Sequence, residues 1–444
     1  MSRRAPSYVS LNVMRSRWIV PCLVLLTATA AAQRAPDPDG DDDPADTGTG
    51  AVPTLGRFER VGRPRGALRR VCDLTAFGDA LYFVESFTPL GSDGARVFRY
   101  APSPDPFTTA FDWNRPGEPT QGGGGGQGFT RVHAIDGRLA VPDADPPYGG
   151  FGVVDHGTEG YVFLSNRAGA FAPPRMPRHR LPGAPDLATD RPGAAILPRA
   201  YHVIDAIRWR GLWIASTGSV PPRERAWYGP SPGALHVANE SLSRWTYALG
   251  YPERTANDVW RLTYMVRFRG RLYAGIQDYW GREGNDYVVL DAPADVAAVR
   301  ASDLRPVHAT PDGGAHTLRW YADRGTLYWV TLERDRRTHL RATSDGDHWR
   351  EVTLPPEAGD VTDVTRWRDG LVALTSAGLW RIDGAAPARI AEAPTVPIRV
   401  RGRAATASHF GVDDIFCAAP LGVYRGELYA GSQRDGSLWR VATP

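Results

Sequence analysis

The sequence has no lysine: all 52 basic residues among its 444 are arginine. Catalysis through a lysine Schiff base is therefore excluded. The formal net charge of +3 is small, so the chain is not expected to bind nucleic acids or membranes in general. No stretch of about twelve residues has a clean helical period. The 48 Gly and 38 Pro instead favour short strands and many turns.

Cysteine is also scarce, and one of the 3 lies in an N-terminal apolar run, "WIVPCLVLL". Arg15 and Arg17 precede this run, and Ala30 and Ala32 follow it at the spacing of a cleavage site. The pattern predicts a signal peptide over residues 1–32. The run is too short to span a bilayer comfortably. We therefore expect an exported protein, periplasmic or secreted, with no transmembrane segment after cleavage.

Cys72 and Cys417 are the cysteines that remain after cleavage. An oxidising compartment favours a disulfide between them, with two buried free thiols as the alternative. The segment "APDPDGDDDPADTGTG" from Ala35 to Gly50 has no large apolar residue and many Asp. Such a composition cannot bury a core, so residues 33–55 are predicted to be a disordered linker.

One pattern recurs through the rest of the chain: an apolar strand, a tight turn with glycine, and a second apolar strand. The turn glycines are Gly78, Gly137, Gly211, Gly270, Gly325, Gly370 and Gly426. A third strand follows each hairpin, and a weaker fourth strand often follows that. Four strands in roughly 40–50 residues is the period of a β-propeller blade. We therefore predict an all-β fold, a seven-bladed β-propeller over residues 56–444.

The two ends of this region are expected to pair. The last repeat has three strands, and the unassigned segment "GRFERVGRP" from Gly56 to Pro64 alternates like a strand. It can supply the missing fourth strand and close the ring. Cys72 and Cys417 would then lie in the innermost strands of the first and last blades, which are neighbours, so a disulfide there would lock the seam.

The repeats resemble the β-propeller superfamily broadly, including kelch-like proteins and sialidase-like proteins with Asp-box turns. The segment "ATSDGDHW" is similar to an Asp-box at Gly346 and Trp349, and departs from it at Ala342 and Ser344. The resemblance implies a structural turn between the third and fourth strands of a blade. It does not imply catalysis.

Candidate binding residues lie in the long loops between second and third strands and at the starts of innermost strands. They are Asp143, Asp145 and Tyr148; His202 and Asp205; Trp227; Gln277, Asp278, Tyr279 and Trp280; and Glu333. In β-propellers these loops share one face of the ring, and binding sites often lie there. We place the candidate site on this face by analogy with that fold. Aromatic rings beside carboxylates suit sugar binding. The alternative is structural: the rings pack loops, the Asp residues cap turns, and the His residues are hydrogen-bonded in the core.

Two hypotheses about function follow. The first is a non-catalytic binding protein whose ligand is a glycan, another small molecule or a protein. The alternative is a sialidase-like glycoside hydrolase or a lyase, which needs two facing carboxylates such as Asp143, Asp278 or Glu333. No cofactor is predicted and no metal site is assigned. Calcium at Asp145 and Asp278 stays an option, as does a metal held by His133, His202 and His316.

Overall fold

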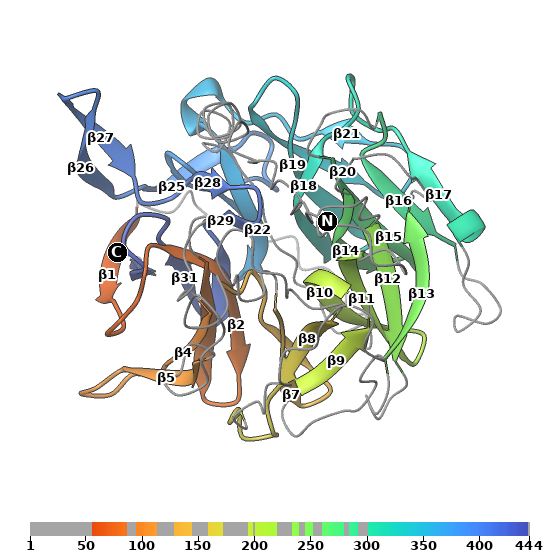
Figure 1. The fold of residues 1–444 in the computed structure, drawn as a ribbon. Helices are drawn as coiled ribbons and strands as arrows, with labels where there is room; N and C mark the ends of the chain where they lie inside the picture. Colours follow the sequence, from red (N-terminus) through yellow and green to blue (C-terminus); the bar gives the residue numbers. More distant parts are fainter. Residues whose placement is uncertain are drawn as a thin grey trace, which may run out of the picture.

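The structure is a computed structural model that describes residues 56–86, 95–112, 128–143, 159–171, 194–198, 200–219, 233–238, 245–251, 260–278, 284–291 and 301–442. Its strands form five four-stranded antiparallel sheets and one eight-stranded sheet (Figure 1). In chain order, the five sheets contain β2 (Arg70–Phe77), β3 (Ala80–Ser86), β4 (Arg96–Tyr100) and β5 (Phe107–Asp112); β6 (His133–Ile135), β7 (Arg138–Pro142), β8 (Glu159–Leu164) and β9 (Ala194–Pro198); β10 (Ala200–Trp209), β11 (Leu212–Ser219), β12 (Gly233–Ala238) and β13 (Trp245–Tyr251); β14 (Trp260–Phe268), β15 (Arg271–Asp278), β16 (Tyr287–Leu290) and β17 (Leu304–Val307); and β18 (His316–Asp323), β19 (Thr326–Leu332), β20 (Thr338–Thr343) and β21 (Arg350–Glu351).

The eight-stranded sheet contains both ends of the described chain. Its order is β22 (Val361–Trp367), β23 (Gly370–Thr375), β24 (Gly378–Arg381), β25 (Ala388–Glu392), β1 (Gly56–Gly62), β32 (Leu438–Ala442), β31 (Glu427–Gly431) and β30 (Leu421–Tyr424). β1 pairs antiparallel with β32 along its length, and parallel with β25 only at Gly56 and Arg57. The predicted pairing of the N- and C-terminal strands is therefore confirmed.

The first strands of the repeats lie next to one another around an axis. In sequence, β2, β6, β10, β14, β18, β22 and β30 each contact the next, and β30 contacts β2 again. The arrangement is all-β and propeller-like, as the repeats predicted. In the described part of the chain, no helix is long and apolar enough to cross a bilayer.

Tight turns join the first and second strands of the sheets. In five of them an Arg or Asp and the following Gly both have positive φ, as at Arg210 (51°) and Gly211 (78°). This is the type I′ geometry that suits a twisted hairpin. Gly370 differs from the other predicted turn glycines, because Arg368 has the positive φ there (56°) and Gly370 begins β23.

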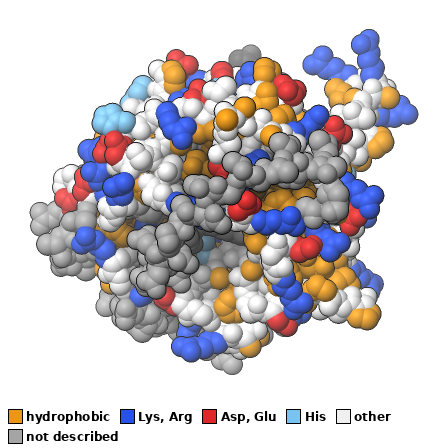
Figure 2. Space-filling model, turned by 180° about the vertical axis from the view of Figure 1, so that it is seen from behind, with side chains coloured by type: hydrophobic (Ala, Val, Ile, Leu, Met, Phe, Trp, Pro, Cys, Tyr) orange, Lys and Arg blue, Asp and Glu red, His pale blue; other side chains and the backbone are white. Residues whose placement is uncertain are grey.

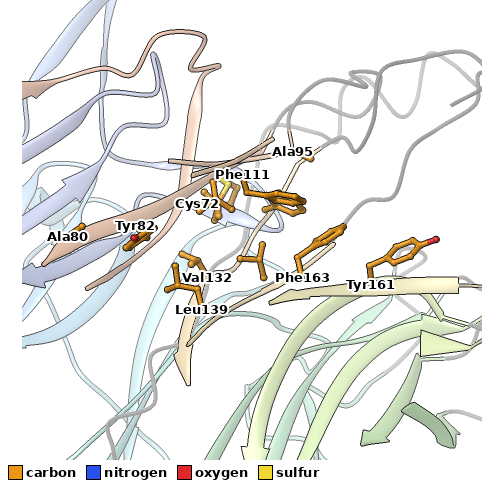
Figure 3. Close-up of a cluster of buried hydrophobic side chains, with 14 residues drawn as sticks. Cys72, Ala80, Tyr82, Ala95, Phe111, Val132, Leu139, Tyr161 and Phe163 are labelled. Carbon is orange, nitrogen blue, oxygen red and sulfur yellow. A yellow bond between two sulfur atoms is a disulfide. The ribbon is translucent and has the colours of Figure 1, made fainter. Parts of the chain in front are cut away.

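The core lies between neighbouring sheets. One apolar cluster joins the β2 sheet to the β6 sheet, with Phe111 and Phe129 against Phe163 (Figure 3). Another joins the β14 and β18 sheets, where Trp320 stacks on Trp329 with ring centroids 5.1 Å apart. Each fully buried aromatic side chain contributes about 1.5–3 kcal/mol. Each sheet therefore depends on its neighbours for stability.

An insertion between β25 and β30 leaves the ring. It contains a hairpin, β26 (Thr395–Val400) and β27 (Arg403–Ser408), and a short ribbon, β28 (Val412–Asp414) and β29 (Cys417–Ala418). The predicted disulfide joins Cys72 and Cys417, with Cα atoms 4.6 Å apart. Cys72 lies in the innermost strand β2 as expected, but Cys417 lies in β29, just before the innermost strand β30. The disulfide therefore ties the ribbon to the ring.

Candidate functional site

Polar side chains occupy matching positions along the innermost strands or, for Arg131, just before one. Each stands four residues before the residue that begins a hairpin turn, and all are at least nine-tenths buried: Asp73, Arg131, Asp205, Tyr264, Arg319 and Asp363. Because the innermost strands surround the axis, this constant offset brings the six side chains together. We call them the axial cluster.

Ion pairs cross the axis within this cluster. Arg319 on β18 lies 3.2 Å from Asp363 on the next strand and 3.4 Å from Asp73 on β2, which is not a neighbour of β18. Arg131 lies 3.5 Å from Asp73 and 3.7 Å from Asp205, and its guanidinium stacks over the ring of Tyr264 at 4.7 Å.

The three Asp side chains of the cluster also accept backbone hydrogen bonds from the next sheet. Asp73 accepts from the N–H of Val132 at 3.0 Å, and Asp205 accepts from that of Met265 at 2.9 Å. Asp363 accepts from the N–H of Leu421 at 2.6 Å. Each carboxylate therefore fastens one sheet to the next, which is a structural role.

Charge state in the cluster follows from burial and from the partners. Desolvation acts to raise the pKa of Asp205, but Arg131 and His133 outweigh it and hold that pKa below its ordinary value. His133 Nε2 lies 2.7 Å from Asp205 Oδ1. Burial lowers the pKa of Arg319 and raises that of Tyr264. The Asp205 carboxylate is thus held in its charged form.

A small cavity with a mainly apolar lining lies beside the cluster, between the β14 and β18 sheets. Its volume is about 10 Å³, close to the room that one water needs. Thr263, Gln277, His316 and Thr317 line it, together with apolar Ile276, Tyr264 and the ribbon residues Ile415 and Phe416. Thr263 and Gln277 stand near the strand ends that face away from the hairpin turn. The cavity therefore lies on the face where the long loops were predicted.

Two buried polar atoms of the cavity lack a hydrogen-bond partner among the described residues: Thr263 Oγ1 and Gln277 Nε2. The Gln277 oxygen is satisfied, because Arg261 Nη1 donates to it at 3.3 Å. A Cβ at Gly275 would lie 2.4 Å from Thr263 Oγ1 and 2.5 Å from Thr317 Oγ1. Glycine at this position thus leaves room for the two hydroxyls. The Gln277 Nε2 donor and the Thr263 hydroxyl could therefore both form hydrogen bonds with a small polar group in the cavity.

The predicted site residues fall into three groups. Asp145, Tyr148, Trp227, Tyr279 and Trp280 lie outside the described residues, and Asp278 is described only in its backbone. Asp143, His202, Asp205 and Gln277 are buried. Glu333 is partly buried. Among these, only Gln277 lines the cavity.

The buried members have partners. Asp143 accepts from the N–H groups of Tyr161 and Val203, both at 3.0 Å, and so joins two sheets. His202 has φ of 62° at a register shift in β10. Glu333 accepts two hydrogen bonds from Arg341, at 2.8 and 3.0 Å. Asp143 therefore has structural partners, but it joins two sheets and does not cap a turn as the structural alternative proposed. Glu333 is paired with Arg341. Whether any of the three binds a ligand stays a prediction.

Sequence reasoning missed most of the axial cluster, namely Asp73, Arg131, Tyr264, Arg319 and Asp363. A signal was present, since each is a polar residue at one fixed distance before a hairpin turn. Among the described residues, no three His, Cys, Asp or Glu side chains are grouped as metal ligands.

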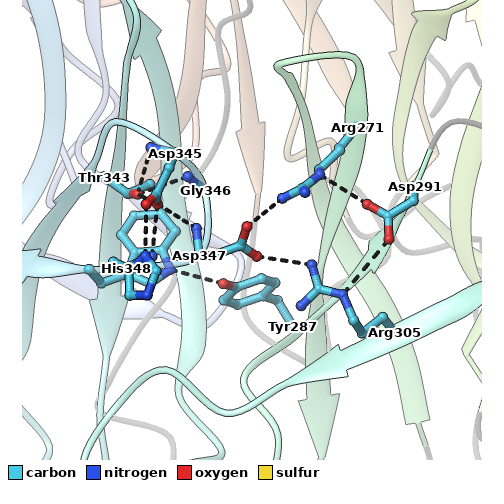
Figure 4. A network of polar contacts seen from close by, with 10 residues as sticks. Arg271, Tyr287, Asp291, Arg305, Thr343, Asp345, Gly346, Asp347 and His348 are labelled. Atoms are coloured by element: carbon cyan, nitrogen blue, oxygen red, sulfur yellow. Dashed lines mark hydrogen bonds and ion pairs between the residues drawn. The ribbon is translucent and has the colours of Figure 1, made fainter.

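The opposite face carries the turn between β20 and β21 (Figure 4). Thr343 Oγ1 accepts from the N–H of Gly346 at 2.9 Å. Asp345 accepts from the N–H groups of Asp347 and His348 at 2.8 and 2.9 Å. The side chains that hold this turn are therefore one residue beyond Ala342 and Ser344, where the resemblance placed them.

Ion pairs join this turn to the neighbouring sheet. Asp347 pairs with Arg271 at 2.7 Å and with Arg305 at 3.0 Å, and both arginines also approach Asp291 (Figure 4). All four side chains are at least about a third exposed, so the network adds little stability.

No protein-family model matches the chain, and no curated protein does. Among solved structures, it is similar to catalytically inactive virginiamycin B lyase from Staphylococcus aureus with quinupristin, at TM-score 0.47 and 7% identity, over 88% of this chain and 100% of that one. It is also similar to a prolyl endopeptidase, at TM-score 0.41 and 11% identity, over 85% and 50% of the two chains. Acylaminoacyl peptidase from Pyrococcus horikoshii matches at TM-score 0.39 and 9% identity, over 76% and 57%. Likenesses this distant support no conclusion about activity.

Proposed function

We propose that the chain is an exported seven-bladed β-propeller that binds a ligand without catalysing its conversion. Carbohydrate is the ligand class that we favour. The count of seven takes the eight-stranded sheet as two blades, because β25 and β1 pair at only two residues. The closed succession of innermost strands supports it. Export rests on the predicted signal peptide, residues 1–32, and the Cys72–Cys417 disulfide is consistent with it.

The cavity beside Gln277 carries the proposal. Buried polar groups in proteins are normally hydrogen-bonded, so two unpartnered atoms facing one cavity need an explanation. A hydroxyl or carbonyl of a ligand would satisfy both. Because the cavity has room for about one water, it would take a single oxygen of the ligand, and the rest of the ligand would lie outside it.

The absence of catalysis is inferred from the state of the buried carboxylates in the described part of the chain. Asp73, Asp205 and Asp363 bind backbone N–H groups and arginines. Asp143 likewise holds two backbone N–H groups. A glycosidase needs one carboxyl as an acid and another to act on the sugar or a water. Groups that fasten the sheets together are poorly suited to either task.

A glycan array tests the proposal. The mature chain, residues 33–444, would be compared with Gln277→Leu and Thr263→Val. Thr263→Val removes one unpartnered polar atom, and Gln277→Leu removes the other together with the oxygen that accepts from Arg261. A lost hydrogen bond of about 0.5–1.5 kcal/mol weakens binding roughly twofold to tenfold. Thr108→Val makes the same change as Thr263→Val on the exposed part of β5 and serves as the control. Glycans bound equally by all four proteins would place the binding site elsewhere, and products released from an array glycan would show an enzyme.

A further inference from the structure

The hairpin β26–β27 stands away from the ring. Its two strands pair with each other and with no other strand among the described residues. Figure 1 shows it projecting beyond β25, and Figure 2 shows the same projection from behind, with basic side chains toward its tip. The turn at the tip is Arg401–Gly402, with φ of 49° and 81°.

The hairpin combines positive charge with an apolar face. Arg399, Arg401 and Arg403 are exposed, and none forms an ion pair within the described residues. Val400 is a large apolar side chain, and it is 51% exposed. Among the described residues, no other large apolar side chain is exposed to this degree. The alternation of a strand puts Val400 on the same face as Val396 and Ile398, both partly buried. The three exposed arginines suit an acidic segment.

The chain itself contains a segment of this kind. Residues 37–46 include six Asp, with Pro, Gly and Ala between them. The described chain begins at Gly56, whose Cα partner in β25 is Ala391, four residues before the hairpin starts at Thr395. The ten residues from Asp46 to Gly56 can extend about 33 Å, and six hairpin residues span about 20 Å. The acidic segment can therefore reach the whole hairpin.

We propose that the hairpin is the docking site for the acidic segment of the same chain, residues 37–46. The charges are opposite, and a short tether gives an effective concentration in the millimolar range, so even a weak contact is substantially occupied. Because the hairpin arginines are exposed to solvent, the contact weakens as salt is added.

Limited trypsin digestion of the mature chain tests this proposal. Trypsin cuts after arginine, and a docked segment shields Arg399, Arg401 and Arg403. The comparison is a chain in which the six Asp at 37, 39, 41, 42, 43 and 46 are replaced by Asn. We expect its hairpin to be cut about fivefold faster at low salt, with the difference lost near 1 M salt. Cutting after Arg324 and Arg336, exposed in turns of the β18 sheet, must stay equal in both chains.

Three results would overturn the proposal. The first is equal hairpin cutting in the two chains at low salt. The second is protection that grows with protein concentration, which would assign the contact to a second copy. The third is equal cutting together with binding of both chains to phosphatidylglycerol vesicles, which would make an anionic surface the occupant. Replacing Arg399, Arg401 and Arg403 by Gln supplies a check that avoids proteolysis. It should make a fluorophore near residue 40 as mobile as in the Asn variant, whereas Gln at Arg324, Arg336 and Arg337 should not.

Discussion

The sharpest prediction concerns Asp205, which holds the axial cluster together. The side chain is fully buried, accepts a hydrogen bond from Met265 N–H, and lies 2.7 Å from His133 Nε2 and 3.7 Å from Arg131 Nε. Asp205→Asn keeps the shape but removes the charge and turns one acceptor into a donor. Breaking a buried ion pair from one side typically costs about 3–5 kcal/mol. Arg131 keeps Asp73 at 3.5 Å, so we expect the lower end, about 3 kcal/mol.

The assay is denaturant unfolding of the mature protein, followed by tryptophan fluorescence and far-UV circular dichroism together. Glu59→Gln is the control, because Glu59 pairs with Arg57 and Arg440 on the surface, where such pairs contribute at most about 1 kcal/mol. A loss at Asp205→Asn no larger than that at Glu59→Gln would refute the view that the axial carboxylates fasten the sheets.

Three further changes test separate parts of the structure. Burial raises the pKa of Glu85 to about 8, so between about pH 4.5 and 8 the folded state holds a proton that the unfolded state has released, and wild type loses stability as pH rises through that range. In urea titrations, Glu85→Gln should therefore gain stability relative to wild type as pH rises from 5 to 9. A stability difference between the two proteins that stays constant across that range would be contrary evidence. Replacing Cys72 and Cys417 together by Ala should lower the free energy of unfolding by about 2–5 kcal/mol, measured without reductant, whereas wild type in reductant should match the variant. Gly275→Ala places a methyl group against the hydroxyl of Thr263. It should abolish ligand binding on the array at a temperature where the variant is still folded. Retained binding would show that the cavity is not the site.

The sequence predicted the fold well because hairpin turns and apolar strands are local features. The pairing of β1 with β32 followed from a missing strand at one end and an unassigned one at the other. The disulfide followed from having two cysteines at the predicted seam. The position of Cys417 in β29 was not predictable, because nothing in the repeat marks a ribbon inserted before the last innermost strand.

The site was harder to predict, because it depends on contacts between distant parts of the chain. Gln277 was singled out for its loop, whereas its place in the proposed site depends on Thr263, which lines the same cavity, and on the space left by Gly275. Asp205 was singled out as a ligand-binding residue, although its contacts are to Arg131 and to the backbone of the next sheet. Such pairings across the ring leave no trace in local spacing.

The central claim is that a ligand binds beside Gln277 while the axial carboxylates remain structural. A crystal structure of the mature protein with the glycan that binds most tightly on the array tests it most directly. We predict an intact glycan with one oxygen within hydrogen-bond distance of Gln277 Nε2 and Thr263 Oγ1, and no contact to Asp73, Asp205 or Asp363. A glycan bound at those carboxylates, or found cleaved, would contradict the account.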